Sequence, residues 1–280
     1  MASDTVLLHS SHAEQFPGSD RDLLLLDRPA STDALARITS VQLWAPPDDP
    51  LQQLPPILAA MTSLRSLTIS GSSTTASVIS QAAQGDLPAG LEELHLHQDY
   101  LKVLAWPDVV MPSLRTLSVA GRFRFDNASF PALTALSIQP DRPLRIVRQA
   151  MELELTDLTL LNVPVEGDEL FPLLAQRPLR RLGLISGTKL TGLDGIERLR
   201  HLEELRLKNL RNLTDIAALR TLPALRRLDL QYCKRIANIE VLNDLDALQR
   251  LTLVGCGDLG LAAVQQRIEG LEQATIGATR

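Results

Sequence analysis

The chain has 280 residues, of which 45% are hydrophobic but only 3% aromatic, so its apolar content is almost entirely aliphatic. Its formal net charge of −5 gives no overall positive field, and we therefore expect no nucleic-acid partner. Two cysteines do not make a disulfide framework, and no apolar run approaches the roughly 18–20 residues of a membrane span. The N-terminus does not have the pattern of a Sec signal peptide, so we predict a cytoplasmic protein, with non-Sec export into a host cell left open.

The first 37 residues are predicted to precede the repeats and to cap them. We interpret residues 1–21 as a flexible segment and residues 22–37 as a cap, in which the apolar run Leu23–Leu26 adds an edge strand. From residue 38 onward an LxxLxL hexamer recurs eleven times, and each copy predicts a short strand. The hexamers begin at residues 38, 64, 91, 114, 133, 155, 179, 202, 225, 248 and 271.

The connections between the hexamers predict short helices. In the 23-residue units the apolar residues that follow the strand recur at every third position, as in Leu213, Ile216, Leu219 and Leu222, which is the period of a 3₁₀ helix. Helical runs are also predicted in longer connections and near the C-terminus. They lie at residues 56–61, 77–83, 169–175 and 261–267.

Eleven hexamers, the last five spaced by 23 residues, resemble the leucine-rich-repeat family over residues 38–276. The step Leu213-Thr-Asp-Ile216 is similar to the internalin-like and cysteine-containing subclasses. The resemblance implies an α/β solenoid shaped as a horseshoe, with a concave parallel sheet of about eleven short strands and with 3₁₀ and short α-helices on the convex side. We expect one solenoid over residues 22–280. Its parts are a cap at 22–37, repeats at 38–257 and a cap repeat at 258–280.

The two cysteines, Cys233 and Cys256, occupy the same position in consecutive repeats. The resemblance implies that this position is a buried turn residue. A disulfide between stacked repeats is geometrically conceivable, but we favour burial. A catalytic thiolate requires an activating base, and no histidine is placed beside either cysteine.

Strand residues alternate in direction, so the third, fifth and seventh positions of each copy line the concave face. Two zones built on these positions, with Tyr100 and Tyr232 just past them, are candidates for partner binding. The C-terminal zone contains Arg181, Glu204, Arg206, Lys208, Arg227, Asp229, Tyr232 and Arg250. The N-terminal zone contains Trp44, Glu93, His95, His97 and Tyr100.

Three interpretations of the C-terminal zone remain open. Arginine and tyrosine favour a protein-docking surface. Alternating charges on adjacent strands also predict a purely structural ladder of lateral ion pairs, through Arg181, Glu204 and Arg227 and between Arg206 and Asp229. The third interpretation is an anion or nucleic-acid site. In the N-terminal zone His95 and His97 have no converging ligands on the neighbouring strands, so we expect no metal.

No catalytic or phosphate-binding motif is present in the sequence. We therefore predict a non-enzymatic, monomeric scaffold that binds a protein or peptide on its concave face, with no cofactor, small-molecule substrate or membrane partner. The alternative is the substrate-recognition module of a bacterial effector or of a ubiquitin-ligase-type assembly whose catalytic part lies in another chain or domain.

Overall fold

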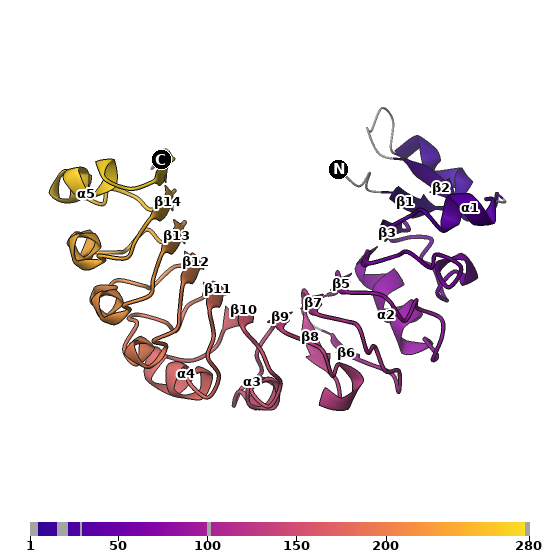
Figure 1. Cartoon of the computed structure of the whole chain (residues 1–280), viewed down its shortest axis with the longest axis horizontal. Coiled ribbons are helices and arrows are strands. Elements are labelled where there is room, and N and C mark those ends of the chain that lie inside the picture. Colours follow the sequence, from indigo (N-terminus) through magenta and orange to yellow (C-terminus); the bar gives the residue numbers. More distant parts are fainter. Residues whose placement is uncertain (1–4, 16–21, 29, 100–101, 278–280) are drawn as a thin grey trace. The chain divides into compact units, whose positions relative to one another are not determined.

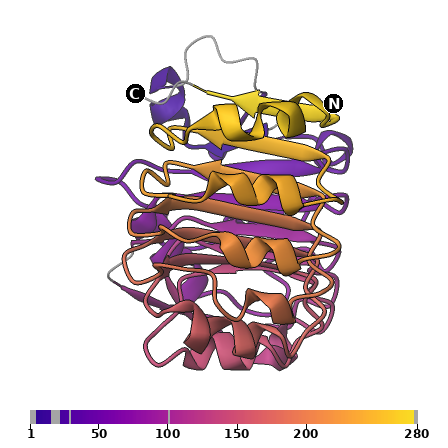
Figure 2. The same cartoon turned by 90° about the vertical axis from the view of Figure 1, so that its left-hand side faces the viewer.

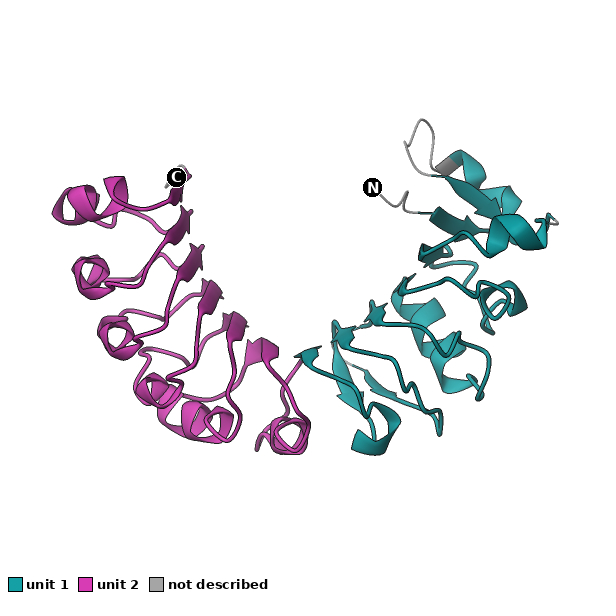
Figure 3. Cartoon of the chain, viewed as in Figure 1, with its two compact units in different colours: residues 1–138 teal, residues 139–280 magenta. Residues whose placement is uncertain are grey.

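The computed structural model describes residues 5–15, 22–28, 30–99 and 102–277. It forms two compact units, Met1–Ile138 and Gln139–Arg280 (Figure 3). In each unit the strands lie side by side along one side, and the helices and long connections lie on the other (Figure 1). All eleven LxxLxL copies form strands of this kind, which confirms the predicted repeat.

The first unit contains a parallel sheet of seven strands in the order β2-β1-β3-β4-β5-β7-β9. These strands are β1 (Thr5–Leu8), β2 (Leu23–Leu25), β3 (Ser40–Trp44), β4 (Ser66–Ser70), β5 (Glu93–Leu96), β7 (Thr116–Val119) and β9 (Ala135–Ile138). Two strands of the long connections form a second parallel pair, β6 (Val103–Ala105) and β8 (Arg122–Arg124). The helices are η1 (Ser10–Gln15), α1 (Thr32–Leu35), η2 (Pro56–Leu58), α2 (Ser72–Ser80) and η3 (Asn127–Ser129), where η denotes a 3₁₀ helix.

The irregular spacing in the first unit is accommodated by an aromatic cluster under these long connections. Trp106 lies 5.0 Å from Phe130 between ring centroids, and Phe123 stacks on Phe125 at 5.4 Å. All four rings are buried. The long connections enclose more volume than short, uniform connections would. The four rings fill this volume, because aromatic side chains bury a large apolar area.

The second unit contains six parallel strands in chain order. They are β10 (Asp157–Val163), β11 (Arg181–Gly187), β12 (Glu204–Leu210), β13 (Arg227–Gln231), β14 (Arg250–Val254) and β15 (Gln273–Ile276). The helices of this unit are stacked in front of the strands in Figure 2. They are α3 (Arg145–Ala150), α4 (Gly167–Leu174), η4 (Ile196–Arg198), η5 (Ala217–Thr221), η6 (Ile239–Asp244), η7 (Leu261–Val264) and α5 (Gln265–Glu269).

The 23-residue spacing fixes the register of the second unit. Leu205 pairs with Leu182 on one side and with Leu228 on the other, and each of the three is buried. The residues at every third position behind the strand, such as Leu213 and Ile216, are fully buried as well. Identical side chains therefore stack in columns, which builds one continuous aliphatic core.

Strands β10 to β14 end in the same left-handed turn. The residues that adopt positive φ there are Asn162, Ser186, Asn209, Tyr232 and Gly255, with φ between 55° and 64°. Glycine and asparagine are suited to this conformation, whereas a bulky side chain is strained in it. Tyr232 is therefore held in an unfavourable backbone conformation.

The N-terminal segment corrects one prediction. Residues 5–8 are the buried strand β1, which pairs with β3 on one side and with β2 on the other. The predicted edge strand at Leu23–Leu25 is present, but β1 lies between it and the first repeat. The interpretation of residues 1–21 as flexible is thus wrong for residues 5–15, while residues 1–4 and 16–21 lie outside the described part.

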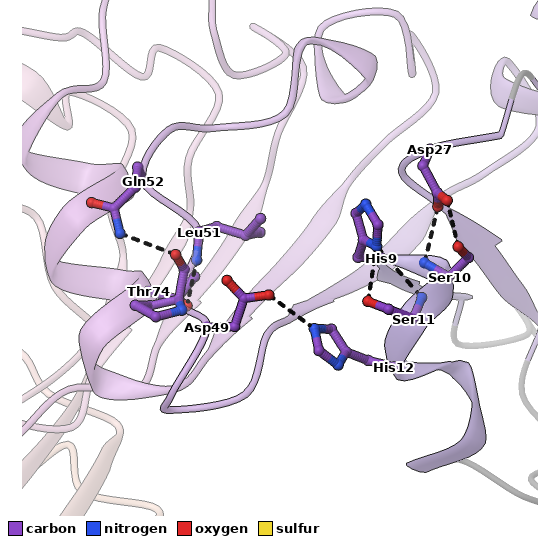
Figure 4. Close-up of polar contacts among 10 residues, drawn as sticks. His9, Ser10, Ser11, His12, Asp27, Asp49, Leu51, Gln52 and Thr74 are labelled. Carbon is purple, nitrogen blue, oxygen red and sulfur yellow. Dashed lines mark hydrogen bonds and ion pairs between the residues drawn. The ribbon is translucent and has the colours of Figure 1, made fainter.

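Polar contacts attach this N-terminal segment to its surroundings (Figure 4). Asp27 accepts hydrogen bonds from the hydroxyl of Ser10 and from the backbone N–H of Ser10, the latter at 2.9 Å. The Nε2 atom of His12 lies 3.2 Å from Oδ2 of Asp49, which follows β3. These bonds tie η1 to loops on both sides of it.

The hydrogen bonds from Ser10 to Asp27 make the stability of this segment depend on pH. They lower the pKa of Asp27 to about 2, the hydroxyl bond contributing most and the backbone N–H next. Because the folded-state pKa lies below the ordinary value of 3.8, this contribution to stability is present above about pH 4 and is lost as the pH falls towards 2. We expect the difference in unfolding free energy between the wild type and Asp27→Asn to shrink over that interval. An NMR titration of the Asp27 carboxyl should show a higher pKa in Ser10→Ala, and an unchanged pKa would contradict the assignment.

Candidate functional site

The strand register confirms the predicted surface columns on the open face of the sheet, which is the face not covered by helices. In the second unit the third-position column pairs Asp157 with Arg181, Arg181 with Glu204, and Glu204 with Arg227. The fifth-position column places Gly183 beside Arg206 and Arg206 beside Asp229. These two columns run next to each other because the side-chain period of a strand is two residues.

Ion pairs between adjacent strands confirm part of the predicted ladder. Nε of Arg206 lies 3.3 Å from Oδ2 of Asp229, as predicted. The residues just before strands β11 and β12, Arg180 and Glu203, form a further pair at 3.3 Å. Arg181, however, pairs with Asp157 on β10 and not with Glu204, which corrects the prediction.

The neighbouring threonine explains which carboxylate Arg181 selects. The hydroxyl of Thr156 donates a hydrogen bond to Oδ2 of Asp157 at 2.7 Å, so that carboxylate is fixed opposite Arg181. Glu204 and Arg227 are left without an ion pair in the described part of the chain. Two unpaired charges therefore lie side by side on the open face.

These residues surround a hollow of about 370 Å³. Its floor lies at Gly183, which has no side chain and which packs closely on Thr159: a Cβ built at Gly183 would be 2.8 Å from Oγ1 of Thr159. Its charged lining is balanced, with three acids and three arginines. We call these six residues the open-face cluster: Asp157, Arg181, Glu204, Arg206, Arg227 and Asp229.

Asp229 is the buried acid of the open-face cluster, with 8% of its surface exposed. Its Oδ2 atom forms the ion pair with Arg206 and accepts a hydrogen bond from the amide of Gln231 at 3.0 Å. Its Oδ1 atom is buried and has no hydrogen-bond partner among the described residues. A buried acceptor without a donor is costly, so the carboxylate of Asp229 depends on Arg206 and Gln231 for its stabilisation.

The structure thus brings together five of the eight residues predicted in the C-terminal zone. Asp157 joins them, although sequence reasoning did not select it; its place in the third-position column was the available signal. Arg250 is exposed on β14 and Lys208 is half-buried on β12, and neither lines the hollow. Tyr232 is 48% exposed but lies at the strand end, away from the hollow.

The residues of the N-terminal zone lie in the first unit and are less closely grouped than those of the C-terminal zone. Nε2 of His95 lies 3.9 Å from Oε2 of Glu93, and His97 is exposed just beyond β5. The half-buried Trp44 meets the ring of His12 edge-on at 6.2 Å between centroids, a neighbour that sequence reasoning missed because it treated residues 1–21 as flexible. Tyr100 lies outside the described residues. No group of three or more potential metal ligands occurs in the part of the chain that the structure describes.

The two cysteines are free and buried. Each thiol lies within hydrogen-bonding distance of a carbonyl of the preceding repeat, Cys233 at 3.5 Å from Leu207 and Cys256 at 3.3 Å from Leu230. Burial raises the pKa of Cys233 to about 11 and also raises the pKa of Cys256. Both thiols are therefore protonated at neutral pH and fill turn positions, as the resemblance implies.

Comparison with known proteins identifies the fold. No protein-family model and no curated protein matches the chain. A similar solved structure is TLR13 in complex with ssRNA13, with a TM-score of 0.50 and 16% identity over 99% of this chain. The chain has the leucine-rich-repeat fold.

The match to TLR13 covers 43% of that protein's chain. The chain is also similar to an internalin, InlF from Listeria monocytogenes strain 4b F2365, with a TM-score of 0.44 and 15% identity over 96% of this chain and 89% of the internalin. Within the described residues, no helix is long and apolar enough to cross a membrane.

Proposed function

We propose that this leucine-rich-repeat protein is a non-enzymatic scaffold that binds a protein or peptide through the open-face cluster. One observation carries the proposal: Glu204 and Arg227 line a hollow on the open face and have no ion pair among the described residues. A purely structural ladder would pair its charges. Here the paired residues hold the hollow in shape, and the unpaired ones are available to a partner.

The chemistry of the hollow indicates what a partner would present. Arg227 offers a guanidinium fork for a carboxylate, while Glu204 accepts from N–H or O–H donors. A polypeptide with both a donor and a carboxylate meets these requirements.

The test is a charge-neutral double variant, Glu204→Ala with Arg227→Ala. Neither residue has an ion pair to lose in the described part of the chain, so the fold should be unaffected. After the partner has been identified by affinity purification and mass spectrometry, we expect its affinity to fall by about tenfold or more, because truncated interface anchors typically cost over 1 kcal/mol.

A matched control is available on the helix side of the same unit. Glu197 and Arg198 are adjacent, exposed and oppositely charged, so Glu197→Ala with Arg198→Ala makes the same chemical change away from the open face. Binding should be unchanged in this control. Equal binding by the wild type and the open-face variant would place the site elsewhere.

RNA is the competing outcome. Because the solved structure of TLR13 is a complex with ssRNA13, nucleic acid recovered with the purified chain should be analysed together with protein. RNA that is retained by the wild type and lost from the open-face variant would replace the protein-binding proposal. The role of a recognition module for an effector or ubiquitin-ligase assembly stays a prediction, and the identity of the partner would decide it.

A further inference from the structure

A second surface of the second unit lies at the edge of the sheet where strands β10 to β13 end. Two hollows of about 570 and 490 Å³ adjoin there and share the lining residues Asn209 and Arg211. We call them together the strand-end groove. Its cations are all exposed: Arg142, Lys189, Arg211, Lys234 and Arg235.

The charge of this groove is of one sign. No carboxylate lines either hollow, and none of its five cations forms an ion pair with a described residue. Arg235 donates to the side-chain oxygen of Asn212 at 3.2 Å, and Asn212 donates to the carbonyl of Thr188 at 2.7 Å, so the groove wall is held by neutral bonds. Like charges gathered without counter-charges repel one another, and an anionic ligand would relieve that repulsion.

The chain's net negative charge does not cancel this local field. Residues 1–138 hold 8 lysines and arginines against 14 acids, whereas residues 139–280 hold 20 against 19. The excess negative charge therefore belongs to the first unit. An argument from the whole-chain charge does not exclude an anionic partner here, because a salt-screened interaction depends on charges within about 10 Å.

Tyr232 forms part of the wall of the groove. It is 48% exposed although its backbone has a φ of 56°. The next repeat has Gly255 at the matching place, where a Cβ would lie 2.5 Å from the Tyr232 ring, so the glycine leaves room for the ring. A strained, exposed aromatic residue beside unpaired cations is typical of a binding surface.

The extent of the groove favours a peptide over a nucleic acid. The register that carries Lys189, Asn212 and Arg235 in three successive repeats continues with the acid Asp258, so the cationic run is short. Tyr232 is the only aromatic residue among those lining the two hollows, whereas sites for single-stranded nucleic acid offer aromatic platforms to successive bases.

We propose that the strand-end groove binds a short acidic segment of a protein partner, with its carboxylates against Lys189, Arg211, Lys234 and Arg235. Carboxylates match the arginine forks bidentately and the lysines as point charges. This surface is distinct from the open-face cluster, so the proposal does not depend on the function proposed above.

The experiment titrates a fluorescent octaglutamate peptide against the full chain at about 0.15 M salt and follows its anisotropy. We expect Lys234→Glu with Arg235→Glu to weaken binding by about tenfold, because two attractive contacts become repulsive. A second variant, Lys189→Glu with Arg211→Glu, should give a similar loss. The control is Arg198→Glu with Arg200→Glu, which makes the same change in net charge at exposed positions elsewhere in the unit and should weaken binding less than about twofold.

Three results would overturn the proposal. They are the absence of octaglutamate binding by the wild type, an equal loss in the groove variants and the control, and tighter binding of an octauridylate that the groove variants abolish. The open-face variant, Glu204→Ala with Arg227→Ala, should bind octaglutamate like the wild type. Failure of either proposal can therefore be recognised separately.

Discussion

Replacing Leu7 with alanine should lower the free energy of unfolding by about 3 kcal/mol, as expected for a leucine truncated in a packed core. Leu7 is fully buried in β1, between β2 and β3, and the variant leaves a cavity that strands paired on both sides cannot close. Urea unfolding followed by circular dichroism measures the loss. The effect is large because β1 covers the apolar face that the first repeat would otherwise expose.

Leu23→Ala is the matched control for this variant. Leu23 is on the adjacent strand β2 but is 39% exposed, so the same truncation should cost less than about 1 kcal/mol. A loss for Leu7→Ala no larger than about 1 kcal/mol would restore the interpretation of the N-terminal segment as flexible.

Replacing Arg206 with alanine is expected to lower the free energy of unfolding by about 2 kcal/mol. Arg206 lies on the surface, but its Nε atom forms an ion pair at 3.3 Å with the buried carboxylate of Asp229, which also accepts a hydrogen bond from Gln231. The other oxygen of that carboxylate has no partner in the described part of the chain, so the loss of Arg206 leaves a buried anion with a single neutral donor. Chemical denaturation of the purified variant measures this cost.

Two comparisons separate the ion pair from general surface effects. Arg227→Ala, on the adjacent strand of the same cluster, removes an arginine that has no ion pair with a described residue and should cost less than about 0.5 kcal/mol. In an Asp229→Ala background, Arg206→Ala should cost much less than in the wild type, because its partner is gone. A full cost in that background would show that Arg206 stabilises the fold through packing.

The sequence predicted the surface columns more completely than the contacts within them. The strict spacing from residue 179 onward settled which residues adjoin, and Arg206 with Asp229 is confirmed as a pair. The choice of Arg181 between Asp157 and Glu204 could not be predicted, because both lie one strand away at equivalent positions. The hydroxyl of Thr156 and side-chain rotamers decide it.

The strand-end cations were missed for a different reason. The predicted zones were built mainly on positions that face outward from the strands, and Tyr232 is the one groove residue that they include. Lys234 and Arg235 follow the strand, in a turn. Turn residues have no periodic direction, so their grouping into one groove becomes visible only when the repeats are stacked.

The spacing of apolar residues was enough to specify the scaffold: eleven strands, their stacking columns and the 3₁₀ connections. It was enough because each repeat needs the same apolar residues at the same spacing to bury its core against its neighbours. Three further features emerge only in the folded chain: residues 5–8 add a strand to the sheet, Asp229 keeps a buried oxygen without a partner among the described residues, and five cations share one groove. Those features depend on contacts that the spacing of apolar residues does not specify, so they become visible only in the folded chain.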